Sequence, residues 1–198
     1  MLRALSPRAL SRRTVVLAAA VLAGVLLIVM LAGGWAGSGG SGATTVDGNA
    51  SAVIYPAGHR PLAPGFSGTT LTGSKLSFSD YRGQVVVLNF WGSWCVPCRE
   101  EASTLAAVAA KYQPSGVSFL GVDVRDTTAG ALAFTHSFHV TYPSVSDPSS
   151  VITLDFTAKV PIAGTPTTLV VDRTGHIAGA VFGTVTYSEL TAILAKVR

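Results

Sequence analysis

The chain has 198 residues, of which 48% are hydrophobic and 12% are charged, and its formal net charge is +4. This length and composition suit one globular domain with an appendage. Four arginines before residue 15 account for the whole net charge, so the rest of the chain is neutral. A neutral domain gives no support to nucleic-acid binding, which needs a basic face on the folded part.

The N-terminal segment has the pattern of a membrane signal. Residues 1–14 are basic, and the uncharged run over 15–36 is about long enough to span a bilayer. A basic flank before such a run predicts a signal-anchor, a single transmembrane helix that leaves residues 1–14 in the cytoplasm. We therefore expect a cell-membrane protein whose folded domain is extracytoplasmic. Cleavage of the segment as a signal peptide, which would make the protein secreted, is the alternative.

Residues 37–61 follow as an expected flexible extracytoplasmic linker. The first part, 37–51, is rich in Gly, Ser and Thr, and such a tether reaches roughly 20–30 Å. Pro56 and Pro61 stiffen the approach to the folded domain, which we expect to cover residues 62–198.

Strand and helix patterns alternate in the folded part. The expected strands cover residues 69–72, 76–78, 85–90, 117–124, 167–172 and 176–182. The expected helices run from Cys95 to about residue 112, from a cap at Thr127 or Thr128, over 150–156, and from a capping box at Thr186–Glu189. Residues 143–146 are too short to assign. The order predicts an α/β fold, in which an N-terminal β-hairpin precedes a central mixed sheet flanked by helices.

The only two cysteines, Cys95 and Cys98, stand two residues apart where the strand 85–90 leads into a helix. Unpaired N–H groups and the positive end of the helix dipole stabilise a thiolate there. Cys95 is expected at the helix cap, facing solvent, as the attacking thiolate. Cys98 lies one turn further, within disulfide reach, as a shielded resolving thiol. The pattern predicts a redox-active disulfide.

Other roles for the two cysteines have less support. A structural disulfide that closes so short a loop constrains the unfolded chain little. Zinc needs four ligands, but no third cysteine exists. Of the four histidines, His136 and His139 are close in the sequence, whereas His59 and His176 lie far from them and from each other. We expect no metal and no cofactor.

Three segments occur in an order and at separations that match a known family: residues 89–101 (NFWGSWCVPCREE), 164–168 (GTPTT) and 171–175 (VDRTG). Over residues 62–198 the chain resembles the thioredoxin-like superfamily. Within it, the chain is similar to the membrane-tethered TlpA/ResA/DsbE-type thiol–disulfide oxidoreductases. The resemblance implies a thioredoxin-like fold and extracytoplasmic thiol–disulfide exchange.

The resemblance also implies roles for single residues. Pro166 is expected to be cis and to pack beside the disulfide, and Thr165 is expected to offer its backbone to an incoming polypeptide. Glu101 matches an active-site glutamate of the family. Asn89 stands where thioredoxin has a buried aspartate, so proton transfer at Cys98 would fall to Glu101, water or a partner group.

Acidic residues in the first turn of a helix also have a simpler explanation, because they favour the helix dipole. That effect alone would account for Glu100 and Glu101. Trp94, next to Cys95, is expected to shield the disulfide and to contact substrate. Trp91 is expected in the core.

The redox direction stays open at the level of sequence. Relatives suggest reduction of protein disulfides in a role of the cytochrome c maturation type, with apocytochrome c as a candidate substrate and a membrane electron donor or acceptor as partner. Val96-Pro97 lacks the glutamate that reducing members often carry between the cysteines. Oxidative disulfide formation is therefore the main alternative. Copper delivery through the two thiolates and peroxidase activity are weaker ones.

Overall fold

The computed structural model describes residues 44–46 and 49–197. The predicted signal-anchor over 15–36 lies outside this part of the chain. Among the helices that are described, none has the length and apolar character needed to cross a membrane.

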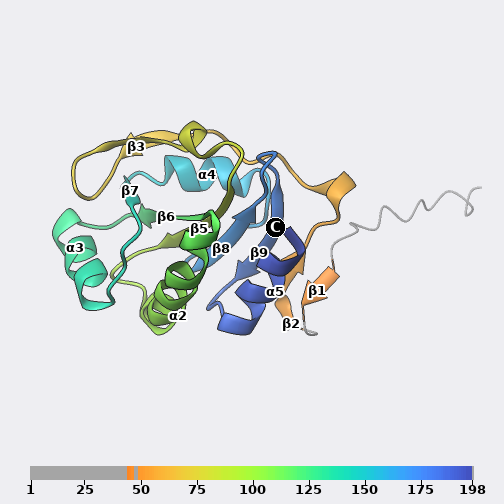
Figure 1. Cartoon of the computed structure of the whole chain (residues 1–198). Coiled ribbons are helices and arrows are strands. Elements are labelled where there is room, and N and C mark those ends of the chain that lie inside the picture. Colours follow the sequence, from red (N-terminus) through yellow and green to blue (C-terminus); the bar gives the residue numbers. More distant parts are fainter. Residues whose placement is uncertain (1–43, 47–48, 198) are drawn as a thin grey trace, which may run out of the picture. The chain divides into compact units, whose positions relative to one another are not determined.

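A seven-stranded sheet forms the centre of the fold (Figure 1). Its order is β1-β2-β9-β8-β5-β6-β7; β5 and β6 as well as β6 and β7 pair parallel, and the other neighbours pair antiparallel. The predicted mixed sheet is therefore confirmed. The strands are β1 (Thr44–Val46), β2 (Asn49–Ile54), β5 (Val85–Trp91), β6 (Val117–Val124), β7 (Ser144–Asp147), β8 (Thr167–Val171) and β9 (Ile177–Phe182).

Helices cover both faces of the sheet. Alternate residues of a strand point to opposite faces, and β5 is buried on both: Val87 packs in one core with α2 and α5, whereas Leu88 packs in another with α4. Figure 1 shows α2 and α5 side by side, away from α4. The helices are α2 (Val96–Tyr112), α3 (Thr128–Ser137), α4 (Val151–Thr157) and α5 (Tyr187–Val197), with short 3-10 turns η2 (Ala57–His59), η3 (Phe78–Tyr81) and η4 (Gln113–Ser115).

Local signals in the sequence account for several of these elements. The β3 (Ser67–Thr69) and β4 (Lys75–Ser77) strands form the expected hairpin as a separate two-stranded sheet. Thr127 caps α3 by accepting a hydrogen bond from the Gly130 N–H. The Thr186–Glu189 capping box also forms, because the Glu189 carboxylate accepts from the Thr186 N–H and the Glu189 N–H donates to the Thr186 hydroxyl.

The segment predicted as a linker, 37–61, contains two strands of the main sheet. In β2, Ala52 pairs with Val181 and Ile54 with Gly179 of β9, and both Ala52 and Ile54 are buried. The folded part therefore begins before residue 62, and the predicted boundary was too late. Only three apolar residues in a row, 52–54, mark this strand in the sequence. Its position depends on pairing with β9, more than 120 residues later.

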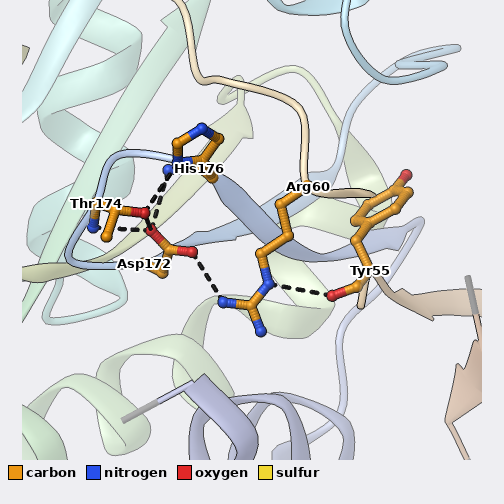
Figure 2. Close-up of polar contacts among 5 residues, drawn as sticks. All are labelled: Tyr55, Arg60, Asp172, Thr174 and His176. Carbon is orange, nitrogen blue, oxygen red and sulfur yellow. Dashed lines mark hydrogen bonds and ion pairs between the residues drawn. The ribbon is translucent and has the colours of Figure 1, made fainter. Parts of the chain in front are cut away.

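A mostly buried ion pair between Arg60 and Asp172 links the segment between β2 and β3 to the β8–β9 turn (Figure 2). The Arg60 guanidinium donates to Asp172 Oδ2 at 2.8 Å and to the Tyr55 carbonyl at 3.1 Å. Asp172 Oδ1 accepts from the backbone N–H groups of Thr174 and His176. Burial alone would raise the pKa of Asp172, but hydrogen bonds from Thr174, Arg60 and His176 lower it to about 2.

Ile54→Ala tests whether the N-terminal strand belongs to the folded unit. Because Ile54 is buried against the core, we expect the free energy of unfolding to fall by roughly 2–4 kcal/mol. Val53→Ala, on the half-buried opposite face, should cost clearly less. Urea denaturation of the two variants measures this. Equal, negligible effects would instead support the linker assignment.

Asp172→Asn tests the ion pair. A carboxyl whose pKa is lowered on folding adds stability above its unfolded pKa, and this stability is lost as the pH falls through the folded value. We expect the variant to lose about 1–2 kcal/mol at pH 7, and the difference from wild type to shrink between pH 4 and pH 2. Urea titrations across this range measure it, with exposed Asp155→Asn as the control. A difference that is constant with pH would contradict the assignment.

Candidate active site

The two cysteines lie where β5 leads into α2. Cys95 is the N-cap of α2, and its sulfur accepts a hydrogen bond from the Cys98 N–H at 3.2 Å. Pro97 sits in the first turn, where its missing N–H leaves no helical bond unmade. The sulfurs of Cys95 and Cys98 are bonded at 2.08 Å, with the Cα atoms 5.3 Å apart. The predicted disulfide is therefore present.

Both cysteines are buried in this disulfide form. Cys95 exposes 4% of its surface and Cys98 exposes 1%. The expected shielding of Cys98 is confirmed, whereas the expectation that Cys95 faces solvent is wrong for this state. Cys95 is buried by tertiary packing, because Leu71, Trp91 and Phe134, from three different segments, pack with the cysteines in one cluster.

Residues at the end of β6 hold the loop that precedes Cys95. The Asp126 carboxylate accepts from both the backbone N–H and the hydroxyl of Ser93. Trp94 Nε1 donates to the Val124 carbonyl at 3.1 Å. Although burial opposes it, hydrogen bonds from Ser93 lower the pKa of Asp126. Asp126 was not predicted as a site residue. Its position just beyond β6, a strand parallel to β5, is the signal in the sequence that points to it.

A second missed carboxyl, Asp123, lies inside β6. It is fully buried, and neither of its oxygens accepts a hydrogen bond from the described residues. Burial, together with the neighbouring charge of Asp126, raises the pKa of Asp123 to about 7. The neutral, protonated form of Asp123 is therefore favoured more than in an ordinary aspartate.

Glu101 is buried one turn after Cys98 on α2. Its Oε1 accepts from Asn89 Nδ2 and its Oε2 from the Val185 N–H, both at 2.8 Å. Asn89 Nδ2 also donates to the Thr168 hydroxyl at 3.1 Å. Burial raises the pKa of Glu101 to about 7, against the opposing effect of the two bonds to its carboxylate. Such a group can both accept and release a proton near neutral pH.

A small enclosed cavity adjoins the shielded cysteine. Its volume is about 10 Å³, the scale of one water molecule, and its lining includes Asn89, Cys98 and Tyr142. Burial, and then the nearby Glu101, raise the pKa of the Tyr142 phenol. Asn89 thus faces both this cavity and the Glu101 carboxylate.

The Thr165–Pro166 bond is cis, as expected. Pro166 is buried and Thr165 half-buried, directly before β8. Thr167, the first residue of β8, pairs with Phe90 near the end of β5. The sheet therefore brings the Thr165–Pro166 loop to the edge where the cysteine loop begins.

The structure brings most of the predicted site residues together. Cys95 caps α2, Cys98 and Glu101 lie within it, and Trp94 and Thr165 line one groove. Within the described residues, no group of three or more His, Cys, Asp or Glu side chains could hold a metal ion.

Comparison with known proteins identifies the chain's relatives. Residues 60–180 match the AhpC/TSA family. The thiol-disulfide oxidoreductase ResA of Geobacillus kaustophilus (strain HTA426) is 32% identical over 136 residues, which cover 69% of this chain and 76% of the relative. ResA of Bacillus subtilis (strain 168) is 32% identical over 128 residues, covering 65% and 69%.

Solved structures agree with these sequence relatives. A secreted thiol-disulfide isomerase from Corynebacterium glutamicum has a TM-score of 0.68 at 31% identity, covering 77% of this chain and 96% of that one. A DsbF homologue from Corynebacterium diphtheriae has a TM-score of 0.65 at 31% identity, covering 77% and 97%. With its disulfide at the start of α2, the chain belongs to the AhpC/TSA family of thioredoxin-like proteins and is a thiol–disulfide oxidoreductase of the ResA/DsbE type.

Proposed function

We propose that this oxidoreductase reduces disulfides of polypeptides outside the cytoplasm, in a role of the cytochrome c maturation type with apocytochrome c as a candidate substrate. The observation that carries the proposal is the Cys95–Cys98 disulfide at the N-terminus of α2, with the buried Glu101 carboxyl one turn behind it. The similarity to ResA proteins supports a shared chemistry.

The reaction starts from the reduced protein. The Cys95 thiolate attacks one sulfur of the substrate disulfide, that bond breaks, and the departing substrate thiolate takes a proton from solvent. Cys98 then loses its proton, attacks the Cys95 sulfur and displaces the second substrate thiolate. Two electrons pass from the two cysteines to the substrate, and the protein is left with the Cys95–Cys98 disulfide.

Glu101 is the proposed base for the second step. Its position one turn after Cys98 and its pKa of about 7 suit a group that takes the Cys98 proton at neutral pH. Asn89 cannot itself take the proton, because an amide does not ionise in this range.

Trp94, Thr165 and Pro166 are the proposed substrate contacts. Trp94 is 49% exposed next to Cys95, and Thr165 precedes the cis bond at the same edge of the sheet. The Thr165 backbone offers hydrogen bonds to an extended polypeptide in the manner of an added strand.

The proposed location is the outer side of the cell membrane. In this proposal residues 1–14 stay in the cytoplasm, 15–36 anchor the chain, and a membrane protein returns electrons to the disulfide after each turnover. The secreted thiol-disulfide isomerase among the structural relatives supports an extracytoplasmic site of action. Cleavage of the segment and secretion is the alternative.

Oxidation of substrate dithiols is a second candidate function. The similar solved structures described as a thiol-disulfide isomerase and a DsbF homologue favour it, and the same residues serve it with the steps reversed.

The reduction potential of the Cys95–Cys98 pair separates the two directions. We expect a value near −270 mV, as in thioredoxin, for a reductant; a value near about −120 mV would identify an oxidant instead. Equilibration with glutathione buffers at pH 7, followed by thiol alkylation, measures it.

Cys98→Ser should trap substrates as mixed disulfides at Cys95, because the resolving thiol is missing. Non-reducing electrophoresis and mass spectrometry identify the trapped proteins. Cys95→Ser is the matched control and should trap far fewer. If neither variant nor wild type exchanges with any disulfide, the proposed function is wrong.

Glu101→Gln tests the proposed base. In the wild type, the rate of the second step should rise through pH 7 as Glu101 ionises. The variant should lose this inflection and react at least about tenfold more slowly at pH 7.5. Stopped-flow kinetics from pH 5.5 to 8.5 measure this, and exposed Glu100→Gln should keep the wild-type profile. An inflection that persists in Glu101→Gln rules Glu101 out.

A further inference from the structure

An open groove of about 480 Å³ runs beside the cysteine loop. Its lining includes Trp94 and Thr165, from the segments that flank the disulfide, and Thr153 and Leu154 of α4. Trp94 is 49% and Leu154 64% exposed, so residues from both regions present apolar surface to solvent. The groove therefore continues the surface that the Thr165–Pro166 loop offers to a substrate.

Arg125 lines the same groove in an unusual backbone conformation. Its φ is +49°, in the left-handed region that residues with a side chain rarely adopt. Both neighbours are bonded to the cysteine loop: the Val124 carbonyl accepts from Trp94, and the Asp126 carboxylate accepts from Ser93. The Arg125 N–H also donates to the Asp147 carbonyl. The backbone of Arg125 is thus fixed beside Trp94, and strain of this kind is concentrated at functional sites.

Two hydroxyl groups of the groove wall have no partner. The side-chain oxygens of Ser150 and Thr165 are buried and make no hydrogen bond within the described part of the chain. Ser150 also has a left-handed backbone, with φ +58°. Buried polar groups are normally paired, but these two oxygens are closed off from solvent, so the binding of a polypeptide in the groove has to be argued from the exposed residues of its lining.

Arg125 gives the groove a positive charge. It is the only charged residue in the lining, and it is exposed. The ion pair found among the described side chains joins Arg60 to Asp172 and leaves Arg125 out. Asp126 is engaged with Ser93, and Asp155 of α4 does not line the groove. A carboxylate on a bound polypeptide is the complementary group.

We propose that this groove binds an extended segment of the substrate polypeptide next to its reactive cysteine and selects an apolar side chain together with an acidic one. The apolar side chain packs between Trp94 and Leu154, and Arg125 binds the carboxylate. This assignment rests on the proposed function and adds the class of substrate: cysteines in acidic, partly apolar sequence.

The test uses the reduced full-length chain and two synthetic peptides. Each carries one cysteine in a mixed disulfide with 2-mercaptoethanol, a neutral thiol, next to a leucine; two Glu flank this pair in one peptide and two Lys in the other. We expect the Glu peptide to react at least about fivefold faster at low salt, with the ratio falling at high salt. Using the ratio cancels any change in the reactivity of Cys95 itself.

Three arginine variants assign the preference. Arg125→Gln should bring the Glu-to-Lys ratio to about one, whereas Arg125→Lys should retain most of it. Arg82→Gln, an exposed arginine outside the groove, should retain all of it. A wild-type ratio near one, or a ratio that survives Arg125→Gln, overturns the assignment of Arg125.

A third peptide, with serine in place of the leucine, tests the apolar part. Wild type should prefer the leucine peptide several-fold, and Leu154→Ser should lose that preference. Equal rates in the wild type would overturn this part. Failure to react with any of the peptides would instead overturn the proposed function along with the inference, so the two failures are distinguishable.

Discussion

The pairing of β5 with β6 on one side and β8 on the other is the constraint on which the site depends. β5 is buried along its whole length, and its two neighbours run in opposite directions. The end of β5, the end of β6 and the start of β8 therefore meet at one edge of the sheet. The cysteine loop, Asp126 and the cis Thr165–Pro166 bond all come from that edge. Segments more than 70 residues apart become one site because three strands share this register.

The buried Glu101 carboxyl behind the cysteines shows how an ionisable group is accommodated in the core. A buried carboxylate is costly unless it is paired or hydrogen-bonded. Glu101 is supplied with two donors, Asn89 from the strand and the Val185 N–H from the segment before α5. These bonds offset part of the cost, so its pKa settles near neutrality rather than far above it. The strand amide thus supports an ionisable group that the helix carries.

The elements that could be predicted from the sequence are those defined by residues close together in the chain. The apolar run of β5, the cysteine spacing and the Thr186–Glu189 capping box each lie within a few residues, and each was predicted with nearly the observed bounds. The resemblance placed the distant Thr165–Pro166 segment near the cysteines, but two other sets of contacts between distant segments were missed. β2 is held by β9, and the burial of Cys95 depends on Leu71 and Phe134. Asp126 became visible as part of the site only when the strand order was known.

The bonds that hold the cysteine loop have a consequence for how the protein meets its partners. Asp126 to Ser93 and Trp94 to Val124 fix the loop through oxygen and nitrogen atoms, and neither bond involves sulfur. Breaking the disulfide therefore removes neither of them. We therefore expect the reduced protein to keep the cysteine loop in the same position, so that the binding of a partner costs little ordering of this loop in either redox state. In the proposed reaction, an electron donor and a substrate would then use one docking surface in turn, and the redox state of Cys95 and Cys98 would decide which of them reacts.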